Sequence, residues 1–204
     1  LRNGVLYLTN AVAEDGEAVQ TSYQLNTLAL DAQSGKVLWS VKIFDQPVDS
    51  AKIHAKNSHA SPTPIVTPTH VYVHFGHLGT ACLTTQGKVV WKTLASTYSP
   101  VHGNGGTPIL HDGKLYFSVD GKVKTLVICL DAATGDTVWE FDRQSAASRK
   151  FSFTTPVIIE VNGKLQLISP ASDIVHAIDP QNGKLIWQVK YDGYSLIPKP
   201  VYHN

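Results

Sequence analysis

Residues 177–187 read Ala-Ile-Asp-Pro-Gln-Asn-Gly-Lys-Leu-Ile-Trp, and two earlier windows of the chain are nearly the same. Residues 29–39 read Ala-Leu-Asp-Ala-Gln-Ser-Gly-Lys-Val-Leu-Trp, and residues 129–139 read Cys-Leu-Asp-Ala-Ala-Thr-Gly-Asp-Thr-Val-Trp. Residues 82–91, Cys-Leu-Thr-Thr-Gln-Gly-Lys-Val-Val-Trp, form a version that is one residue shorter and lacks the aspartate. The tryptophans that close the windows are 52, 48 and 48 residues apart. A period of about 40–50 residues is typical of β-propeller blades, so the repeat predicts an all-β propeller.

The repeat that ends at Trp139 shows the content of one unit most clearly. Apolar and β-branched runs at 107–110, 115–119, 125–130 and 136–141 are separated by turn sequences rich in Asp and Gly. Four short runs joined by tight turns predict a four-stranded antiparallel meander. By the same template we expect first strands at 63–66 and 155–158, second strands at 5–8, 71–74 and 165–168, and fourth strands at 89–91 and 185–187.

Both faces of the fourth strand are apolar, as the sequence Val37-Leu38-Trp39 shows, so the sheet needs cover on both sides. Radially stacked blades provide that cover and leave only short edges. We therefore predict one partial propeller domain over residues 1–204, with about four blades' worth of strands. The approximate blades are 1–44 (second to fourth strands only), 58–94, 104–142 and 152–190, with 198–204 as the first strand of a further blade. The stretch 11–24, with Glu14, Asp15 and Glu17, is expected to be an enlarged loop of the first blade.

The repeated residues have packing and turn roles in this scheme. In Asp-x-x-x-Gly, the Asp hydrogen-bonds nearby backbone and the Gly accepts a positive φ. Each tryptophan is expected to dock on the neighbouring blade, burying about 200 Å². The residues assigned to structure in this way are Trp39, Trp91, Trp139, Trp187, Gly35, Gly87, Gly135, Gly183, Asp31, Asp131 and Asp179. Cys82 and Cys129 occupy the same phase of the repeat, so we expect two buried, unpaired thiols.

Bulk composition narrows the class of protein. The chain has 17 basic and 16 acidic residues in 204, and no dense Lys/Arg run, which argues against a nucleic-acid partner. No stretch approaches the roughly 18 apolar residues of a membrane span. No signal peptide is visible and methionine is absent, so we expect the chain to begin inside a larger gene product or to have lost its start.

The motif Ala-x-Asp-x-x-x-Gly-Lys-x-x-Trp resembles the tryptophan-docking repeat of propellers of the pyrroloquinoline-quinone (PQQ) type, which include quinoprotein dehydrogenases and BamB-like envelope proteins. The stretches 57–64, 100–106 and 191–195 look like those of secreted propeller proteins of planctomycete-type bacteria. The resemblance covers essentially the whole chain. It implies seven or eight blades, so the chain looks like a fragment, and it implies an extracytoplasmic location, in the periplasm or secreted. This superfold carries both catalysts and scaffolds.

The loops that follow the second and fourth strands converge at one end of a propeller, and loops carry function more often than the scaffold does. We therefore expect ligand-binding residues in these loops and no catalytic residue. The candidates are Asn57, Ser58, His59, His74, His77, His102, Asn104, Asp120, Lys150, Asp173 and Tyr194.

Four of these candidates are histidines on adjoining blades: His59, His74, His77 and His102. Neutral imidazole is a common ligand of transition metals, so these residues are weak candidates for a metal site. The alternatives are hydrogen bonding of loop backbone by His59 and His102, which we favour, and contact with a ligand without metal. Phosphate loops, nucleophile elbows and paired glycosidase carboxylates are not apparent.

Two classes of function remain open. The favoured one is a non-catalytic scaffold of the bacterial cell envelope that binds a protein or small ligand at its loop-rich face and needs no cofactor. The alternative is a quinone- or metal-dependent oxidoreductase that uses PQQ with calcium, whose other site residues lie outside this segment. The absent first strand at the beginning and the spare strand at the end also predict pairing. Either the rest of the same polypeptide or a second chain, joined head to tail, would complete the ring.

Overall fold

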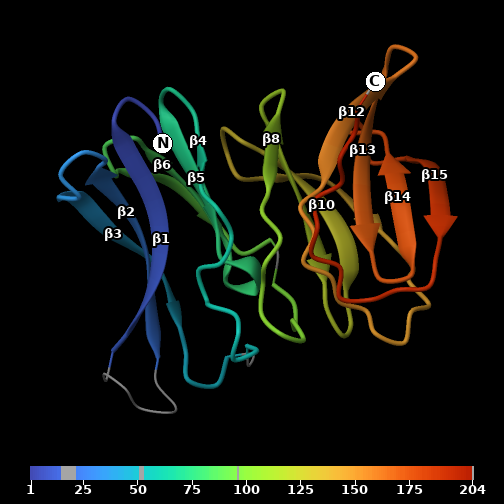
Figure 1. Ribbon diagram of the computed structural model, residues 1–204, viewed down its shortest axis with the longest axis horizontal. Helices are drawn as coiled ribbons and strands as arrows, with labels where there is room; N and C mark the ends of the chain where they lie inside the picture. Colours follow the sequence, from blue (N-terminus) through green and yellow to red (C-terminus); the bar gives the residue numbers. More distant parts are fainter. Residues whose placement is uncertain (15–21, 51–52, 96, 204) are drawn as a thin grey trace. The chain divides into compact units, whose positions relative to one another are not determined.

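The computed structural model describes residues 1–14, 22–50, 53–95 and 97–203, and within them the chain is built from fifteen strands and one short 3-10 helix (Figure 1). The first sheet consists of β1 (Val5–Ala13), β2 (Tyr23–Asp31) and β3 (Val37–Gln46). The second consists of β4 (Ile65–Val66), β5 (His70–His74), β6 (Thr80–Thr84) and β7 (Val89–Thr93), with the 3-10 helix η1 (Gly76–Leu78) between β5 and β6. The third consists of β8 (Ile109–His111), β9 (Lys114–Asp120), β10 (Thr125–Asp131) and β11 (Thr137–Asp142). The fourth consists of β12 (Val157–Val161), β13 (Lys164–Ala171), β14 (Ile174–Ile178) and β15 (Leu185–Lys190).

Every sheet is an antiparallel meander in which neighbours in sequence are neighbours in space. This confirms the blade predicted from the repeat, including the three-stranded first sheet. Among the described residues, no helix is long and apolar enough to cross a membrane.

The first strand of each four-stranded sheet starts two residues later than predicted, at Ile65, Ile109 and Val157. The residue before each of these is a proline, which has no N–H to donate to a sheet. The predicted loop 11–24 is also shorter, because β1 continues to Ala13 and β2 begins at Tyr23. Of this loop, Asp15 and Glu17 lie outside the described residues.

The expected strand at 198–204 does not form in the part of it that is described, residues 198–203. In this segment Tyr202 contacts the fourth sheet through its side chain, because Tyr202 Oη donates to the Glu160 carbonyl at 3.1 Å.

The fourth strands differ from the expectation that both of their faces are covered. Along the third strand, the register with the fourth strand shifts just after the residue that pairs with each tryptophan, at Ala29/Leu30, Cys82/Leu83, Cys129/Leu130 and Ala177/Ile178. The extra residue of each bulge is the apolar one before the tryptophan, and all four of these side chains are exposed: Leu38, Val90, Val138 and Ile186. The apolar residue before each tryptophan is therefore the extra residue of a recurrent β-bulge, and its side chain is not buried on a second face of the sheet.

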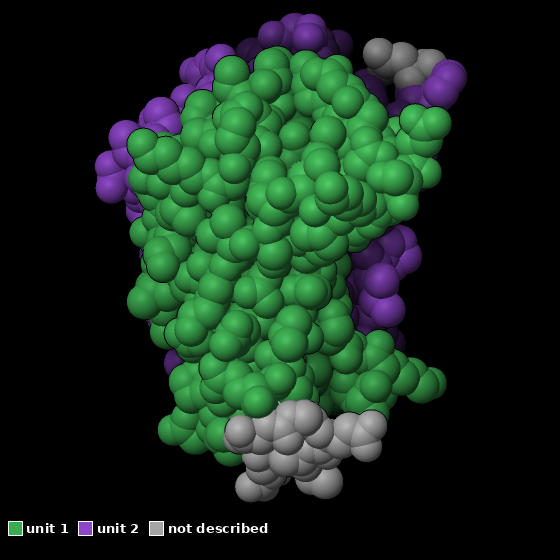
Figure 2. Space-filling view, turned by 90° about the vertical axis from the view of Figure 1, so that its left-hand side faces the viewer, with its two compact units in different colours: residues 1–97, 102–104 green, residues 98–101, 105–204 purple. Residues whose placement is uncertain are grey.

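The chain divides into two compact units of two sheets each (Figure 2). Unit 1 comprises residues 1–97 and 102–104, with β1–β7, and unit 2 comprises residues 98–101 and 105–204, with β8–β15. The prediction of one continuous domain stays a prediction.

Two tryptophans join the sheets inside the units. In unit 1, Trp39 Nε1 donates to the Thr85 carbonyl at 3.2 Å, and a Cβ on Gly87 would lie 2.8 Å from the indole. In unit 2, Trp139 Nε1 donates to the Pro180 carbonyl at 3.1 Å, and a Cβ on Gly183 would also lie 2.8 Å from the indole. For Trp39 and Trp139, the glycine of the turn in the next sheet therefore lies directly against the indole ring.

Apolar side chains of both blades surround each docked ring. In unit 1 the buried cluster includes Leu25 and Ile43 from the first sheet with Val71 and Val73 from the second. In unit 2 it includes Tyr116, Val127 and Cys129 from the third sheet with Leu167 and Ile178 from the fourth. Burial of apolar surface between facing sheets stabilises each unit.

The turn prediction holds for the aspartates. Asp31 Oδ1 accepts hydrogen bonds from the backbone of Gln33 and Ser34, at 3.1 and 2.7 Å. Asp131 Oδ1 accepts from the backbone of Ala133 and Thr134, and Asp179 Oδ1 accepts from the backbone of Gln181. These carboxylates close the turns in which they lie.

Cys82 and Cys129 are free and buried, as predicted. Burial raises the pKa of the Cys82 thiol to about 11 and that of the Cys129 thiol to about 12. Because the thiolate is the reactive form, we expect no reaction of the native chain with a disulfide reagent such as dithionitrobenzoate. Two thiols should react once the chain is unfolded in denaturant, and rapid labelling of the native chain would contradict the packing described.

Candidate functional site

The predicted loop residues of unit 1 are held together by an asparagine. Asn57 Nδ2 donates to the carbonyls of His102 and Asn104, at 2.9 and 3.2 Å, and Asn57 Oδ1 accepts from Ser58 N and Ser61 Oγ. Asn57 therefore ties the segment after β3 to the segment 102–104, which is distant in sequence. Ser58 Oγ lies 3.1 Å from Ser61 Oγ, inside the same loop.

Three of the predicted histidines are neighbours at the end of β5. His74 Nδ1 lies 2.9 Å from Thr80 Oγ1, and His77 Nε2 lies 3.0 Å from Ser50 Oγ. The ring of His59 packs against Tyr23, with 4.7 Å between centroids. Burial, followed by the charge of His77, lowers the pKa of His74 to about 3. Burial, followed by the charge of His59, lowers the pKa of His77 to about 4. These imidazoles are neutral at pH 7.

The fourth histidine stands apart from this group. The ring of His102 contacts His54 edge to face at 5.4 Å, and the His102 carbonyl accepts from the His54 backbone N–H at 3.1 Å. In the described ranges, no three His, Cys, Asp or Glu side chains are placed so that they could hold a metal ion. The cavity beside His59, His77, Gly103 and Asn104 has a volume of about 10 Å³, which is at the lower limit for one water molecule.

The buried histidines predict a pH-dependent stability of unit 1. Their pKa values in the folded chain, about 3 and about 4, lie below the roughly 6.5 of an unfolded chain, so the unfolded state binds more protons as the pH falls below 6.5. The free energy of unfolding should therefore be flat above pH 7 and fall between pH 6.5 and 5. Each histidine should add up to about 1.4 kcal/mol per pH unit to the slope. Urea titrations across this range should show a smaller slope for His74→Gln, and an unchanged slope would contradict this account.

Asp120 lies at the end of β9 in a buried polar network of unit 2. Its Oδ1 accepts from Arg143 Nε at 2.9 Å, and its Oδ2 accepts from the hydroxyl of Ser152. Arg143 also donates to the Ser169 carbonyl, to Ser169 Oγ and to Ser118 Oγ, at 3.0, 2.7 and 2.9 Å. The side chains of Arg143 and Asp120 are 0% and 2% exposed. Sequence reasoning placed Asp120 at the binding face, whereas the structure places it inside the protein.

The charge state of this network follows from its geometry. Burial raises the pKa of the Asp120 carboxyl, while the Arg143 charge and the hydrogen bonds from Ser152 and Arg143 act in the opposite direction. The guanidinium does not lose its proton in proteins, so Arg143 stays charged beside Asp120. His176 Nδ1 lies 3.3 Å from Arg143 Nη1, and burial together with that charge lowers the pKa of His176 to about 4. A neutral His176 can accept a hydrogen bond from Arg143.

Three predicted residues remain at the loop end of unit 2. Asp173 adopts a positive φ of 64° in the β13–β14 turn, and its Oδ1 accepts from Gly193 N at 3.3 Å. Tyr194 is 53% exposed, and the guanidinium of Arg149 lies over its ring at 4.1 Å from the centroid. Lys150, which follows Arg149 in the sequence, is half-buried. Arg149 and Tyr194 together form an exposed pair of the kind that is frequent in protein interfaces.

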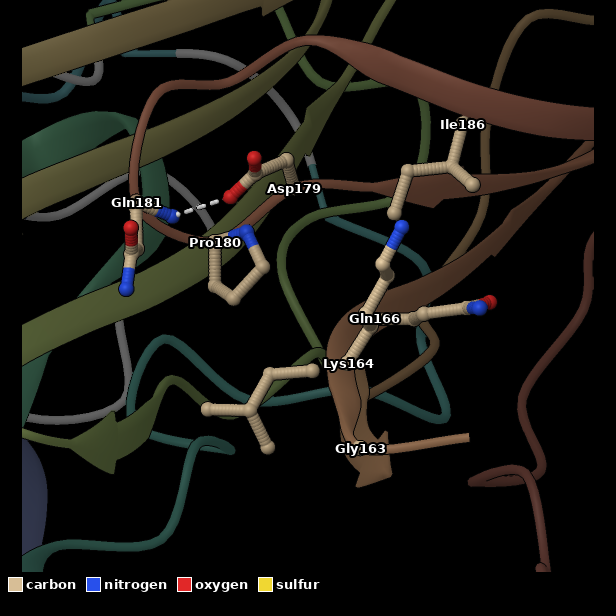
Figure 3. A pocket seen from close by; sticks show the side chains of 8 residues that line it. Gly163, Lys164, Gln166, Asp179, Pro180, Gln181 and Ile186 are labelled. Carbon is tan, nitrogen blue, oxygen red and sulfur yellow. Dashed lines mark hydrogen bonds between the residues drawn. The ribbon is translucent and has the colours of Figure 1, made fainter. Parts of the chain in front are cut away.

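Hollows in the described part of unit 2 include two that are large enough for a ligand group. One, of about 300 Å³, lies between the loop 143–147, the turn 172–174 and the end of β15. The other, of about 520 Å³, lies at the opposite end of the fourth sheet (Figure 3). Its lining combines Leu165, Pro180 and Ile186 with Lys164 and Gln181. Asp179, on its wall, accepts hydrogen bonds from Gln181 N and Asn182 Nδ2 within its own turn, both at 2.8 Å.

Sequence reasoning missed Arg143 because the residue lies outside the repeated motif. A signal was present: Arg143 follows the fourth strand of the blade in which Asp120 ends the second strand, so opposite charges stand at the same end of one sheet. The sequence did not reveal the hollow of Figure 3, because the turns that line it contain only residues typical of hairpin turns.

Residues 26–193 match the model of a family described as outer membrane protein assembly factor BamB. The chain belongs to this BamB-like family of PQQ-type repeat proteins. The match spans all four tryptophan windows and every strand from β3 to β15. No curated protein matches the chain.

Solved structures with a similar fold include alcohol dehydrogenases. The chain is similar to a quinohemoprotein alcohol dehydrogenase from Comamonas testosteroni, with a TM-score of 0.57, 14% identity, and coverage of 92% of this chain and 33% of that chain. A quinohemoprotein alcohol dehydrogenase from Pseudomonas putida HK5 gives a TM-score of 0.54 and 16% identity over 83% of this chain and 33% of that chain. A europium-containing methanol dehydrogenase gives a TM-score of 0.54 and 14% identity over 89% and 39%.

These likenesses confirm the predicted fold class, a partial β-propeller with blades of antiparallel strands. At such low identity they carry the fold alone. The chain spans between a third and two fifths of the length of these three proteins.

Proposed function

We propose that the chain is part of a non-catalytic propeller of the bacterial cell envelope that binds a protein partner through its loops. The observation that supports this most directly is the buried environment of the Asp120 side chain. Its carboxylate is one of the two acids, with Asp173, that the sequence placed in the binding loops, and its two oxygens accept hydrogen bonds from Arg143 and Ser152 inside the protein. A buried, doubly bonded carboxylate is a stabilising group and is poorly placed to act as a catalytic base.

The other ionisable candidates support the same proposal. His74 and His77 hydrogen-bond Thr80 and Ser50, and His59 packs on Tyr23. The exposed surface of these loops offers Arg149 and Tyr194, which are residue types that contribute much of the energy in protein interfaces. The family description, outer membrane protein assembly, supports an extracytoplasmic location and a protein as the partner.

A site-specific crosslinking experiment tests the proposal. A photo-crosslinking amino acid at Tyr194 is expected to capture a discrete protein in cells of a BamB-containing bacterium, while the same group at Val138, exposed on a bulge, captures none. Equal or absent capture at both positions would contradict protein binding through these loops.

The competing oxidoreductase is tested on the same preparation. The chain is mixed with PQQ and calcium, and quinone absorbance and dye reduction are followed with a primary alcohol. We expect neither saturable binding nor turnover, and dye reduction that depends on PQQ, calcium and alcohol together would overturn the non-catalytic proposal.

A further inference from the structure

A polar hollow of about 300 Å³ lies in unit 2, and one of its walls is formed by Gln188 and Lys190 of β15. Gln188 pairs across the ladder with His176, whose ring contacts Phe141 of β11 with 5.1 Å between centroids. Directly paired residues, and residues two apart on a strand, share a face of a sheet. Gln188 and Lys190 therefore lie on the face of the fourth sheet that meets the third, and the hollow is bounded by two complete four-stranded blades.

The second wall is the loop that follows β11, and local hydrogen bonds fix its shape. Asp142 Oδ1 accepts from Gln144 N at 2.9 Å, and Ser145 Oγ accepts from Ala147 N at 3.2 Å. Gln144 has a φ of 46°, a left-handed conformation that is uncommon for this residue type and is found more often at binding sites. The wall is thus formed before a ligand arrives, as is usual for small-molecule sites.

The third wall is the β13–β14 turn, which carries Asp173. The Asp173 backbone N–H donates to the Gly193 carbonyl at 2.8 Å, and the Asp173 carbonyl accepts from Tyr191 N at 3.1 Å. These bonds hold the turn at the hollow. The carboxylate Oδ1 accepts from Gly193 N at 3.3 Å, and no donor among the described residues reaches Oδ2.

The polar side chains of the hollow are largely unused by the protein itself. In the part of the chain that the structure describes, the side chains of Gln144, Gln188 and Lys190 have no hydrogen-bond or ion-pair partner. Lys190 and Asp173 carry opposite charges and line the same hollow, but within the described ranges they do not pair with each other. The hollow therefore offers an ammonium, a carboxylate oxygen and two amides that can each donate and accept.

We propose that this hollow binds a free α-amino acid with a small aliphatic side chain. The α-carboxylate of the ligand accepts from the Lys190 ammonium, and its α-ammonium donates to Asp173, so that both bonds are charge-assisted. A zwitterion satisfies both protein charges, whereas a simple anion or cation satisfies one. The buried side chains of Ala147 and Ile174 supply the apolar wall for the aliphatic group.

Neither Arg149 nor Tyr194 lines this hollow, so amino-acid binding and the protein binding proposed above can be tested separately. Isothermal titration calorimetry of the 204-residue chain with L-alanine, L-valine and L-leucine, up to roughly 10 mM, provides the first test. We expect saturable binding of one ligand per chain, with a Kd between about 10 µM and 1 mM for at least one of the three.

Two variants remove the two charges of the hollow. Lys190→Gln and Asp173→Asn should each weaken binding by at least about tenfold, because each removes one charge-assisted bond. Lys184→Gln and Asp112→Asn are the matched controls and should leave the affinity unchanged. Lys184 is an exposed lysine of the turn before β15, and Asp112 is an exposed aspartate in the β8–β9 hairpin whose positive φ, 45°, resembles the 64° of Asp173.

Ligand analogues give the decisive readout, measured by NMR titration. Leucinamide lacks the carboxylate, so it should bind the wild-type chain and Lys190→Gln equally weakly. N-acetyl-leucine lacks the ammonium, so it should bind the wild-type chain and Asp173→Asn equally weakly. A loss of stability in a variant would not produce this dependence on the ligand. The proposal would be overturned by the absence of saturable binding of all three amino acids, by an unchanged affinity in Lys190→Gln or Asp173→Asn, by equal weakening in the control variants, or by a Lys190→Gln effect that is as large for leucinamide as for leucine.

Discussion

Replacing Arg143 with methionine is expected to lower the free energy of unfolding by about 3–5 kcal/mol, the largest single effect we anticipate. The variant removes the charge that faces Asp120 and leaves a buried carboxylate with the Ser152 hydroxyl as its remaining described donor. It also removes donors from Ser118 and Ser169. Urea denaturation followed by tryptophan fluorescence and by circular dichroism measures the change.

Two controls separate the buried pair from a general charge effect. Lys42→Ala breaks the pair of Lys42 with Asp45, whose side chains are 46% and 59% exposed, and should cost less than about 1 kcal/mol. Combining Arg143→Met with Asp120→Leu removes both charges and should recover much of the loss, because an apolar pair carries no desolvation penalty. If Arg143→Met and Lys42→Ala had similar effects, the network would not be the stabilising element described here.

Gly183→Ala is expected to destabilise unit 2 by about 1–3 kcal/mol more than Gly163→Ala does. Both glycines have positive φ, 74° and 73°, so both variants share the backbone strain of an L-residue in this region. Only at Gly183 does the new Cβ meet a tryptophan ring, 2.8 Å from the Trp139 indole. The backbone strain is the same in both variants. The difference between their losses of unfolding free energy therefore reports the contact between Gly183 and the Trp139 ring.

The same urea titration, with near-ultraviolet circular dichroism of the tryptophans, checks this prediction. The Trp139 environment should change in Gly183→Ala and stay as in the wild type in Gly163→Ala. Equal losses of stability would mean that the glycine serves the turn alone and that the tryptophan does not depend on it.

Much of the fold could be predicted because its determinants are local. The Asp31 carboxylate bonds to backbone two and three residues away, and the tryptophan period counts blades without reference to any distant contact. The errors are local as well: prolines delay three first strands by two residues, and a bulge places Leu38 in solvent. The positions of the candidate loops follow from the repeat in the same way, whereas the partners of their side chains do not.

The sequence by itself determined the meander of strands in each of the four sheets, the turns that connect them, and the structural roles of Asp31, Asp131, Asp179, Trp39 and Trp139, although the strand expected at 198–204 does not form. These follow from short-range geometry that repeats along the chain. Only the tertiary structure decided that Asp120 is paired with Arg143, 23 residues away, and that Asn57 bonds to the backbone 45 and 47 residues away. Such contacts depend on which strand ends meet when sheets pack face to face, and no spacing rule within one repeat contains that information. The same packing distinguishes Gly183, covered by a tryptophan, from Gly35, which has the same turn and an open face.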